Sequence, residues 1–219
     1  GKIILSTFVT IVFALLLNEI KNKFMKRSIQ TIVYLPNFLS WVILATVVVN
    51  IFSYEGPINA VLEMLGIEPI LFMASNKWFR SVLIVTDVWK GFGYGAIIYL
   101  AALSGIDPGL YEAAAIDGAN RFKRVWHITL PGILPTIMLV TIMNLPNVLN
   151  AGFDQIFNLY NPLVMETADI IDTWVYRVGL VERQYSLGTA VGLLRSIVGI
   201  ILMLSANKIA QKVTDYRIF

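Results

Sequence analysis

The sequence contains no cysteine and a single histidine, His127. The lack of cysteine excludes a disulfide framework, a thiol nucleophile and a cysteine-ligated metal site. A lone histidine without clustered carboxylates does not indicate a metal centre either. The chain also has no Gly-x-x-x-x-Gly-Lys-Ser/Thr phosphate loop and no Ser-His-Asp arrangement. We therefore expect no catalytic residue, no metal and no cofactor in this chain.

Charge is scarce as well, because only 14% of the 219 residues are charged while 57% are hydrophobic. The mean hydropathy of +0.72 lies well outside the range of soluble domains. A net charge of +3 could suggest nucleic-acid binding, but basic cytoplasmic loops of a membrane protein explain it better. The chain begins inside an apolar run at Gly1, so we expect a missing N-terminal piece that includes another helix.

Long apolar runs define the expected architecture, an all-α polytopic transmembrane helical bundle formed by one domain over residues 1–219. A helix needs about 20 apolar residues to cross a membrane. We expect five visible spans at residues 3–17, 31–52, 81–103, 130–150 and 186–206. The first is short for a span. Residues 53–80 and 151–185 are predicted to be loops, the former with a surface helix at 58–65 and the latter polar and aromatic.

Basic residues predict the orientation, since cytoplasmic loops are enriched in Lys and Arg. One side carries ten: Lys21, Lys23, Lys26, Arg27, Arg121, Lys123, Arg124, Lys208, Lys212 and Arg217. The other side carries five: Lys2, Lys77, Arg80, Arg177 and Arg183. The first side is therefore predicted to be cytoplasmic, and residues 151–185 to be extracytoplasmic.

A densely patterned polar stretch separates the third and fourth apolar runs. An Ala-rich segment at 111–116 and a basic, aromatic segment at 119–127 are both predicted to be short helices, and Gly118 between them allows a sharp turn. Pro131 marks the return to an apolar run. The residues by themselves are equally compatible with an amphipathic hairpin that lies on the membrane surface.

The spacing of this stretch resembles the EAA loop of permease subunits in binding-protein-dependent (type I) ABC importers. The matching positions are Glu112, Ala113, Ala114, Gly118, Ile128, Leu130 and Pro131. Three further stretches, Tyr34-Leu-Pro36, 98–108 and 153–162, resemble permeases for oligosaccharides and polysaccharides of the alginate type. The likeness covers nearly the whole chain.

The resemblance implies a multi-pass permease of the bacterial cytoplasmic (inner) membrane. Its expected partners are a second permease, two copies of a cytoplasmic ATPase that binds ATP and Mg²⁺, an extracytoplasmic solute-binding protein, a carbohydrate and membrane lipid, and no nucleic acid. Residues 104–130 would dock into the ATPase through Glu112, Ala113, Ala114, Asp117, Gly118, Arg121, His127, Ile128, Leu130 and Pro131. In the outer loop, the expected contacts with the binding protein are Phe157, Tyr160, Asn161 and Asp169.

Polar residues inside the spans are the candidates for the substrate path, because a charge in hydrocarbon must be sheltered. These are Asp87, Asn144, Asn147 and Arg195. Asn144 and Asn147 could bind sugar hydroxyls or only join helices. Arg195 could line the path or anchor a carboxylate. Asp87 and Lys90 share a helix face, which favours a local ion pair.

Two other features leave alternatives open. Gly91, Gly95 and Ala102 share a helix face with Asp87, and Gly188, Gly192 and Gly199 share one with Arg195, which favours close packing of helices. Pro146 is expected to kink the fourth span. Glu166, Asp169 and Asp172 are interpreted as a solvated acidic face that contacts a partner.

The rival function is an ion-coupled secondary transporter that uses Asp87, Lys90 and Arg195 as coupling groups.

Overall fold

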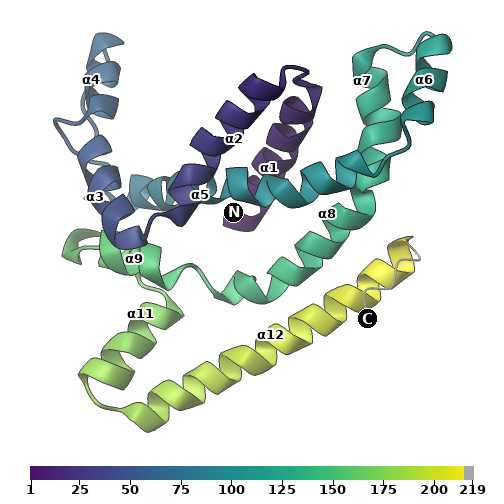
Figure 1. Cartoon of the computed structure of the whole chain (residues 1–219). Coiled ribbons are helices and arrows are strands. Elements are labelled where there is room, and N and C mark those ends of the chain that lie inside the picture. The colour runs from purple at the N-terminus through teal and green to yellow at the C-terminus, as the bar shows by residue number, and fades with distance from the viewer. Residues whose placement is uncertain (215–219) are drawn as a thin grey trace.

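The computed structural model describes residues 1–214 and, within them, every side chain except those of Pro146 and residues 209–214. Every regular element in this part of the chain is helical, which confirms the all-α prediction. Four helices in it are long and apolar enough to cross a membrane. They are α1 (Lys2–Glu19), α5 (Asn76–Ser104), the continuous helix Arg121–Asn144, and α12 (Tyr185–Thr214) (Figure 1).

A fifth span exists only if two helices bent by 105° are counted as one. These are α2 (Lys23–Phe38) and α3 (Trp41–Ile51), so the single uninterrupted span predicted for 31–52 is wrong. Pro36 lies in the last turn of α2, and the backbone is extended at the two residues that follow the helix. The helix direction therefore changes where the sequence suggested only an apolar run.

Lys90 of α5 donates hydrogen bonds to the backbone carbonyls at this break. Its Nζ lies 3.2, 2.8 and 2.9 Å from the carbonyl oxygens of Pro36, Asn37 and Leu39. At the start of α3, the Oγ of Ser40 accepts a hydrogen bond from the backbone N–H of Ile43. A cation at a helix C-terminus also interacts favourably with the helix dipole, so Lys90 stabilises the break.

The fourth apolar run is part of a longer helix than expected. α7 (Arg121–Arg124), the π-helical turn η1 (Val125–Thr129) and α8 (Leu130–Asn144) follow one another without a gap. The prediction of a separate short helix at 119–127 is therefore wrong at its C-terminal end. Pro131 cannot donate a backbone hydrogen bond, and the ladder shifts to i−5 bonding directly before it, where the Leu130 N–H donates to the Val125 carbonyl. The π turn thus carries the helix past the proline.

At its other end, α8 gives way to a 3-10 segment, η2 (Leu145–Leu149), in agreement with an irregularity expected near Pro146. The side chain of Pro146 lies outside the described part. The chain then enters the outer segment, which is mostly helical rather than an irregular loop. Its elements are α9 (Phe153–Leu159), η3 (Pro162–Val164), α10 (Met165–Ala168), α11 (Ile171–Val175) and the π-helical η4 (Tyr176–Val181).

α5 is the central helix, with α1 and α2 packed along it. The small residues that share a helix face with Asp87 are not the positions where a neighbouring helix comes closest to α5. A Cβ added at Gly91 would meet nothing within 4 Å, and one at Gly95 would make ordinary contact with Thr10. The tight position is Gly93, on another face, where an added Cβ would lie 2.6 Å from the carbonyl oxygen of Val33. Gly93 therefore permits α2 to approach α5.

Two hydrophobic clusters hold the bundle together. One joins α3, the first half of α5 and α9, around the fully buried Phe79; the other joins α1, the second half of α5 and α8, around Tyr99 and Ile133. Gln155 of α9 is also fully buried, and its amide donates to the Leu83 carbonyl at 2.8 Å. The outer segment is therefore anchored to α5 by packing and by a buried hydrogen bond.

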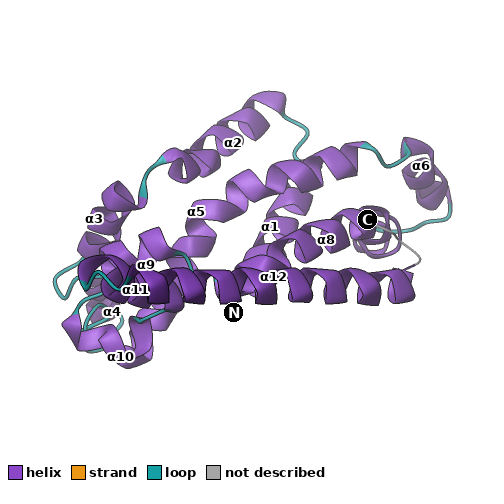
Figure 2. Ribbon diagram, turned by 90° about the horizontal axis from the view of Figure 1, so that it is seen from below, coloured by secondary structure: helices purple, strands orange, loops and turns teal. Residues whose placement is uncertain are grey.

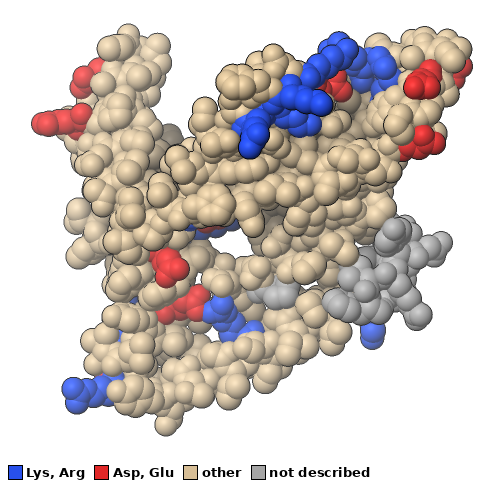
Figure 3. Space-filling model, in the orientation of Figure 1, with Lys and Arg blue, Asp and Glu red and all other residues tan. Residues whose placement is uncertain are grey.

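The segments predicted to face opposite sides of a membrane lie at opposite ends of the molecule. Figure 2 shows α6 (Pro108–Ile116) at one end and α4 (Pro57–Met64), α9, α10 and α11 at the other. The basic corner between α1 and α2 lies with α7, and Figure 3 shows Lys and Arg gathered there, with acidic side chains over α6. Two residues counted for the orientation, Lys212 and Arg217, lie outside the side chains that are described.

Two glycines on α5 provide a matched test of this packing. Gly93→Ala should destabilise the protein by about 1–3 kcal/mol, because the new Cβ would press on the backbone of α2. Gly91→Ala, two residues away, should be neutral or slightly stabilising, by up to about 1 kcal/mol. Thermal unfolding of the purified complex in detergent measures the difference, and equal melting temperatures for both variants would contradict this account.

Candidate functional site

The four polar residues predicted to lie on the substrate path meet at two adjacent cavities. Asp87 of α5 lines the first cavity, of about 400 Å³, together with Asn144 at the end of α8 and Asn147 of η2. Arg195 of α12 lines the second cavity, of about 450 Å³, and Asn147 lines this one as well. Because both cavities share Asn147, the polar groups of α5, α8, η2 and α12 surround two neighbouring cavities.

The first cavity is also lined by residues that the sequence did not indicate. Its lining includes Lys2, Ser6 and Thr7 of α1 and Asn150 after η2. The sequence places Lys2 among the outer basic residues, whereas in the structure its Nζ donates to the Ala151 carbonyl at 2.7 Å and to the side chain of Gln155. The sequence spacing could have indicated this placement, because Lys2 and Ser6 are four residues apart and therefore share a helix face.

Asp87 and Lys90 do not form the local ion pair that their spacing favoured. Asp87 is instead paired with Lys2, whose Nζ lies 3.7 Å from its carboxylate. The ammonium of Lys90 is occupied by the three carbonyls at the end of α2. The reason is that three carbonyls at the end of α2 lie within 3.2 Å of the Lys90 Nζ, whereas the carboxylate of Asp87 lies beyond ion-pair distance from it.

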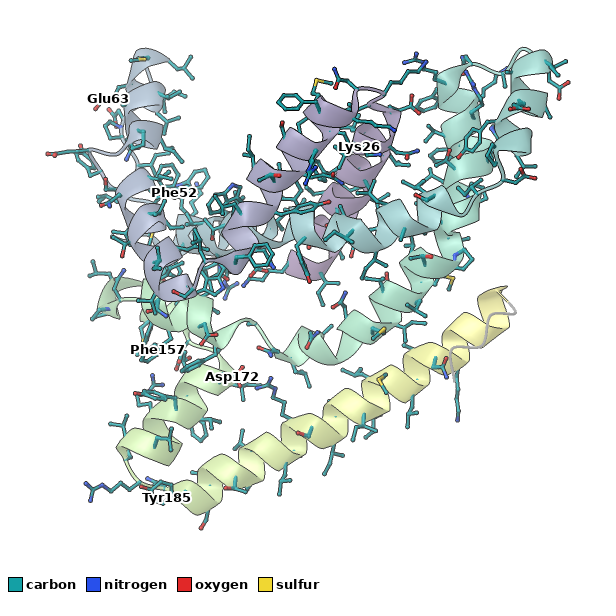
Figure 4. All side chains as sticks on the ribbon, viewed as in Figure 1. Lys26, Phe52, Glu63, Phe157, Asp172 and Tyr185 are labelled. Atoms are coloured by element: carbon teal, nitrogen blue, oxygen red, sulfur yellow. The ribbon has the colours of Figure 1, made fainter. Side chains whose placement is uncertain are left out.

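Arg195 forms an ion pair with Asp172 of α11, so it anchors a carboxylate and lines the second cavity at the same time. Figure 4 shows Asp172 on the side of α11 that faces α12. The interpretation of Glu166, Asp169 and Asp172 as a solvated acidic face is therefore wrong for Asp172, which is half-buried, while Glu166 and Asp169 are exposed. Asp172 is bound by Arg195, and Asp169 is paired with Arg177 at 2.6 Å.

The chemistry of the two cavities suits an uncharged, hydroxyl-rich group better than a bare ion. Both cationic side chains have carboxylate partners, so the net charge of each pair is small. What remains are amides and hydroxyls, which both donate and accept hydrogen bonds: Asn144, Asn147, Asn150, Ser6, Thr7 and Ser196. Within the described residues, no three acidic or histidine side chains converge as metal ligands.

The segment predicted to dock into an ATPase is a tightly capped helical hairpin. α6 (Pro108–Ile116) begins with Pro108 after Asp107, whose carboxylate accepts from the Gly109 N–H at 2.9 Å. It ends in a Schellman motif at Gly118, which has φ +73°. The Ala119 N–H donates to the Ala114 carbonyl at 2.9 Å, and the Gly118 N–H donates to the Ala115 carbonyl at 3.2 Å.

Two further side chains complete the hairpin. Asn120 caps α7 by accepting from the Lys123 N–H at 2.8 Å. At the base, the hydroxyls of Tyr111 and Thr129 are hydrogen-bonded at 3.0 Å, which ties the start of α6 to the end of η1. The hairpin is therefore closed at its tip by backbone geometry and at its base by a side-chain bond.

The predicted docking residues lie mostly on the outside of this hairpin. Exposed are Glu112, Ala113, Asp117, Gly118, Arg121, His127 and Pro131, while Ala114, Ile128 and Leu130 are half-buried. His127 bonds through Nδ1 to the Lys123 carbonyl at 2.9 Å. Large apolar side chains are also uncovered here, with Ile116 88% and Phe122 76% exposed. Such an apolar, capped projection is suited to contact with another protein.

The four residues predicted to contact a binding protein divide into two groups. Phe157 and Tyr160 are half-buried in an aromatic cluster, with the Phe157 ring 5.9 Å from Tyr160 and 4.9 Å from Tyr176 (Figure 4 labels Phe157). Asn161 is used internally, because its amide donates to the Met73 carbonyl at 2.8 Å and its oxygen caps η3. Asp169 is likewise occupied by Arg177.

The Asp169–Arg177 pair stabilises the start of α11. Burial raises the pKa of Asp169, but hydrogen bonds from Arg177 and Thr173 outweigh it and leave this pKa below its ordinary value. The hydrogen bond to Asp169 raises the pKa of Arg177 in turn. Both groups are therefore charged at neutral pH, and the pair contributes stability that is lost only as the pH falls through the lowered pKa of Asp169.

Comparison with curated proteins identifies relatives along almost the whole chain. It is 44% identical over 210 residues to the protein LplB of Bacillus subtilis, covering 95% of this chain and 66% of LplB. It is 41% identical to the polygalacturonan/rhamnogalacturonan transport system permease protein YteP of the same organism, covering 96% of this chain and 66% of YteP. The chain therefore spans slightly less than two thirds of the length of these relatives.

Solved structures show the same arrangement of helices. A bacterial ABC transporter involved in the import of the acidic polysaccharide alginate matches with a TM-score of 0.89 and 40% identity, over 94% of this chain and 72% of that one. The alginate transporter in complex with an alginate pentasaccharide-bound periplasmic protein matches with a TM-score of 0.93 and 38% identity, over 99% and 76%. The sequence profile of a family described as "Binding-protein-dependent transport system inner membrane component" matches residues 6–215. The chain therefore belongs to this family of inner-membrane permease components.

Proposed function

We propose that this chain is one permease subunit of an ATP-driven importer and that, with a second permease, it forms the path for an oligosaccharide or polysaccharide. The observation that carries the proposal is the pair of neighbouring cavities that meet at Asn147, which amides and hydroxyls from four segments face. Sugars are recognised by such mixed donors and acceptors in a pocket that is largely preformed. The relatives named above, one for polygalacturonan and one for alginate, support the same class of solute.

The charge of the solute depends on how the two ion pairs behave. A neutral sugar would leave Lys2–Asp87 and Arg195–Asp172 intact and bind to the amides between them. An anionic sugar would offer a carboxylate to Arg195, whose guanidinium can bind it in a bidentate manner. Both modes use the same cavities, so the class of solute does not depend on which of them operates.

In this proposal the free energy for transport comes from ATP hydrolysis by a separate ATPase subunit, which is present in two copies and binds ATP and Mg²⁺. The hairpin at 104–130 docks into that subunit through its exposed outer residues. Because the hairpin is closed at both ends, by the Schellman motif at Gly118 and by the Tyr111–Thr129 bond, it moves as a rigid unit. Motion of the ATPase then passes directly into α7 and the continuous helix that leads to Asn144 and the cavities.

The segment 151–185 is proposed to receive an extracytoplasmic solute-binding protein, with Phe157 and Tyr160 as its contact residues. Their aromatic cluster is half-buried and lies at the end of the molecule opposite the docking hairpin (Figure 2). Asn161 and Asp169, which are engaged inside the chain, would then support the contact surface rather than form it.

An ion-coupled secondary transporter is not favoured. The chain belongs to a family of binding-protein-dependent transport components. Of the three proposed coupling groups, Lys90 is engaged with the backbone at the end of α2, and Arg195 is paired with Asp172. A coupling group must change its protonation or its partner during the cycle, whereas Lys90 has a structural role at a helix break.

Replacing Asn144 and Asn147 together by Leu should reduce solute uptake by at least about tenfold, because two amide hydrogen bonds to the solute are lost. Assembly and basal ATPase activity of the complex should persist. Uptake into proteoliposomes and ATPase activity would be measured side by side. The control is Asn18→Leu, which replaces an exposed asparagine near the C-terminal end of α1 that lines neither cavity. Normal uptake by the double variant would show that the solute passes elsewhere.

Gly118→Leu should uncouple ATP hydrolysis from uptake, because a left-handed residue with a Cβ costs about 1–2 kcal/mol and the Schellman turn would open. Gly118→Asn is the matched control, since asparagine tolerates this conformation. Nothing lies within 4 Å of the added Cβ, so the two variants differ in backbone strain rather than in a clash. ATPase stimulation by the loaded binding protein is the measurement, and full stimulation with normal uptake in Gly118→Leu refutes the role of the turn.

Photocrosslinkers placed at Phe157 or Tyr160 should capture the solute-binding protein when ATP is bound and hydrolysis is blocked. A crosslinker at Phe122, at the opposite end of the molecule, serves as the control and should capture the ATPase instead. Mass spectrometry of the adducts identifies the partner. Adducts from Phe157 and Tyr160 that contain only the second permease would assign the outer segment a structural role.

A further inference from the structure

A third cavity lies between the α1–α2 corner and the base of the docking hairpin. Its volume is about 220 Å³, and it is more enclosed than the two cavities of the proposed path. Its lining consists of Glu19, Lys21, Tyr111, Arg121, Arg124, Val125 and Thr129. The size is below the roughly 300–1,000 Å³ that is typical for drug-sized ligands, so the cavity suits a small group rather than a sugar chain.

The charges around this cavity are not balanced. Lys21, Arg121 and Arg124 contribute three positive charges, and Glu19 contributes one negative charge. Among the side chains that the structure describes, the ion pairs are those of Lys2, Arg177 and Arg195, so these four groups are not paired with one another. The cavity therefore has an excess of positive charge, which favours an anion.

Among the lining residues, Arg124 indicates an anion-binding site most specifically. Its Nε atom is buried and has no hydrogen-bond partner among the described residues. A buried donor without an acceptor costs free energy, more so in a charged group. An oxyanion in the cavity would provide the acceptor, and the fork of the guanidinium matches the oxygens of a phosphate group.

The neighbourhood of the cavity is that of a membrane interface. The basic residues of the α1–α2 corner are adjacent, and Figure 4 labels Lys26 there. Large apolar side chains at the same end are uncovered, among them Phe24 at 81% exposure and Trp126 at 61%. Aromatic and basic residues together are typical of the headgroup region, where anionic lipids are attracted to basic clusters.

We propose that this cavity binds a phosphate group, provided either by the headgroup of an anionic lipid or by a phosphate ion in solution. The anion accepts hydrogen bonds from Arg124 and is held by Lys21 and Arg121 across the cavity. Because Lys21 belongs to the α1–α2 corner and Arg124 to the base of the hairpin, the anion connects two parts of the fold. Glu19 opposes binding, so its carboxylate weakens the affinity.

The test uses the whole complex in nanodiscs of phosphatidylcholine with a variable fraction of phosphatidylglycerol, and native mass spectrometry counts the phosphatidylglycerol retained. In a second arm, inorganic phosphate is added to complex in pure phosphatidylcholine, and the shift in melting temperature measures binding. The variants are Arg124→Gln, Lys21→Gln and Glu19→Gln. Lys123→Gln is the matched control, because it removes one charge from the same helix but does not line the cavity.

Arg124→Gln and Lys21→Gln should each weaken binding about tenfold, which corresponds to the loss of one charge-assisted hydrogen bond. Glu19→Gln should strengthen binding, a change of sign that damage to the fold would not produce. Lys123→Gln should bind as the unmodified protein does. This pattern in the lipid arm identifies a headgroup site, and the same pattern only with inorganic phosphate identifies a site for the free ion. If Arg124→Gln binds both probes normally, or if Lys123→Gln weakens binding equally, the proposal is overturned.

Discussion

A helix that crosses a membrane must satisfy its own backbone hydrogen bonds, because lipid offers no substitute for water. This chain breaks that rule between α2 and α3, where two residues are extended and the helices diverge by 105°. The ammonium of Lys90 on the carbonyls of Pro36, Asn37 and Leu39 makes the break tolerable. Because Lys90 belongs to α5, the bend is fixed to the central helix, and the cluster that joins α3 to α9 follows from that placement.

The same cost of unpaired polar groups explains how the proposed path is built. Each charge that lines the two cavities is paired across elements, Lys2 of α1 with Asp87 of α5 and Arg195 of α12 with Asp172 of α11. Charges held in this way position the helices around the region that contains Asn147. In the proposed function the neutral amides bind the solute, because amides can exchange partners at a lower cost than buried charges.

The hairpin that we propose to dock into an ATPase is stabilised differently, because it projects from the bundle and has no hydrophobic core of its own. Capping by Asp107 and Asn120, the left-handed Gly118 and the Tyr111–Thr129 bond hold it together. The continuous helix that starts at α7 then links it to the proposed path, past Pro131 through a π-helical turn. A phosphate bound beneath the hairpin would connect this unit to the α1–α2 corner as well.

The sequence by itself determined the features that depend on near neighbours along the chain. The apolar runs predicted an all-α membrane bundle, and the spacing from Glu112 to Pro131 indicated the permease family, because helix caps and the turn at Gly118 are local signals. Only the tertiary structure decided which charges meet. Asp87 binds Lys2 rather than Lys90, and Lys90 binds carbonyls 51–54 residues away. A residue's possible partners on its own helix are visible in the sequence, whereas a nearer partner on another helix is brought there only by packing.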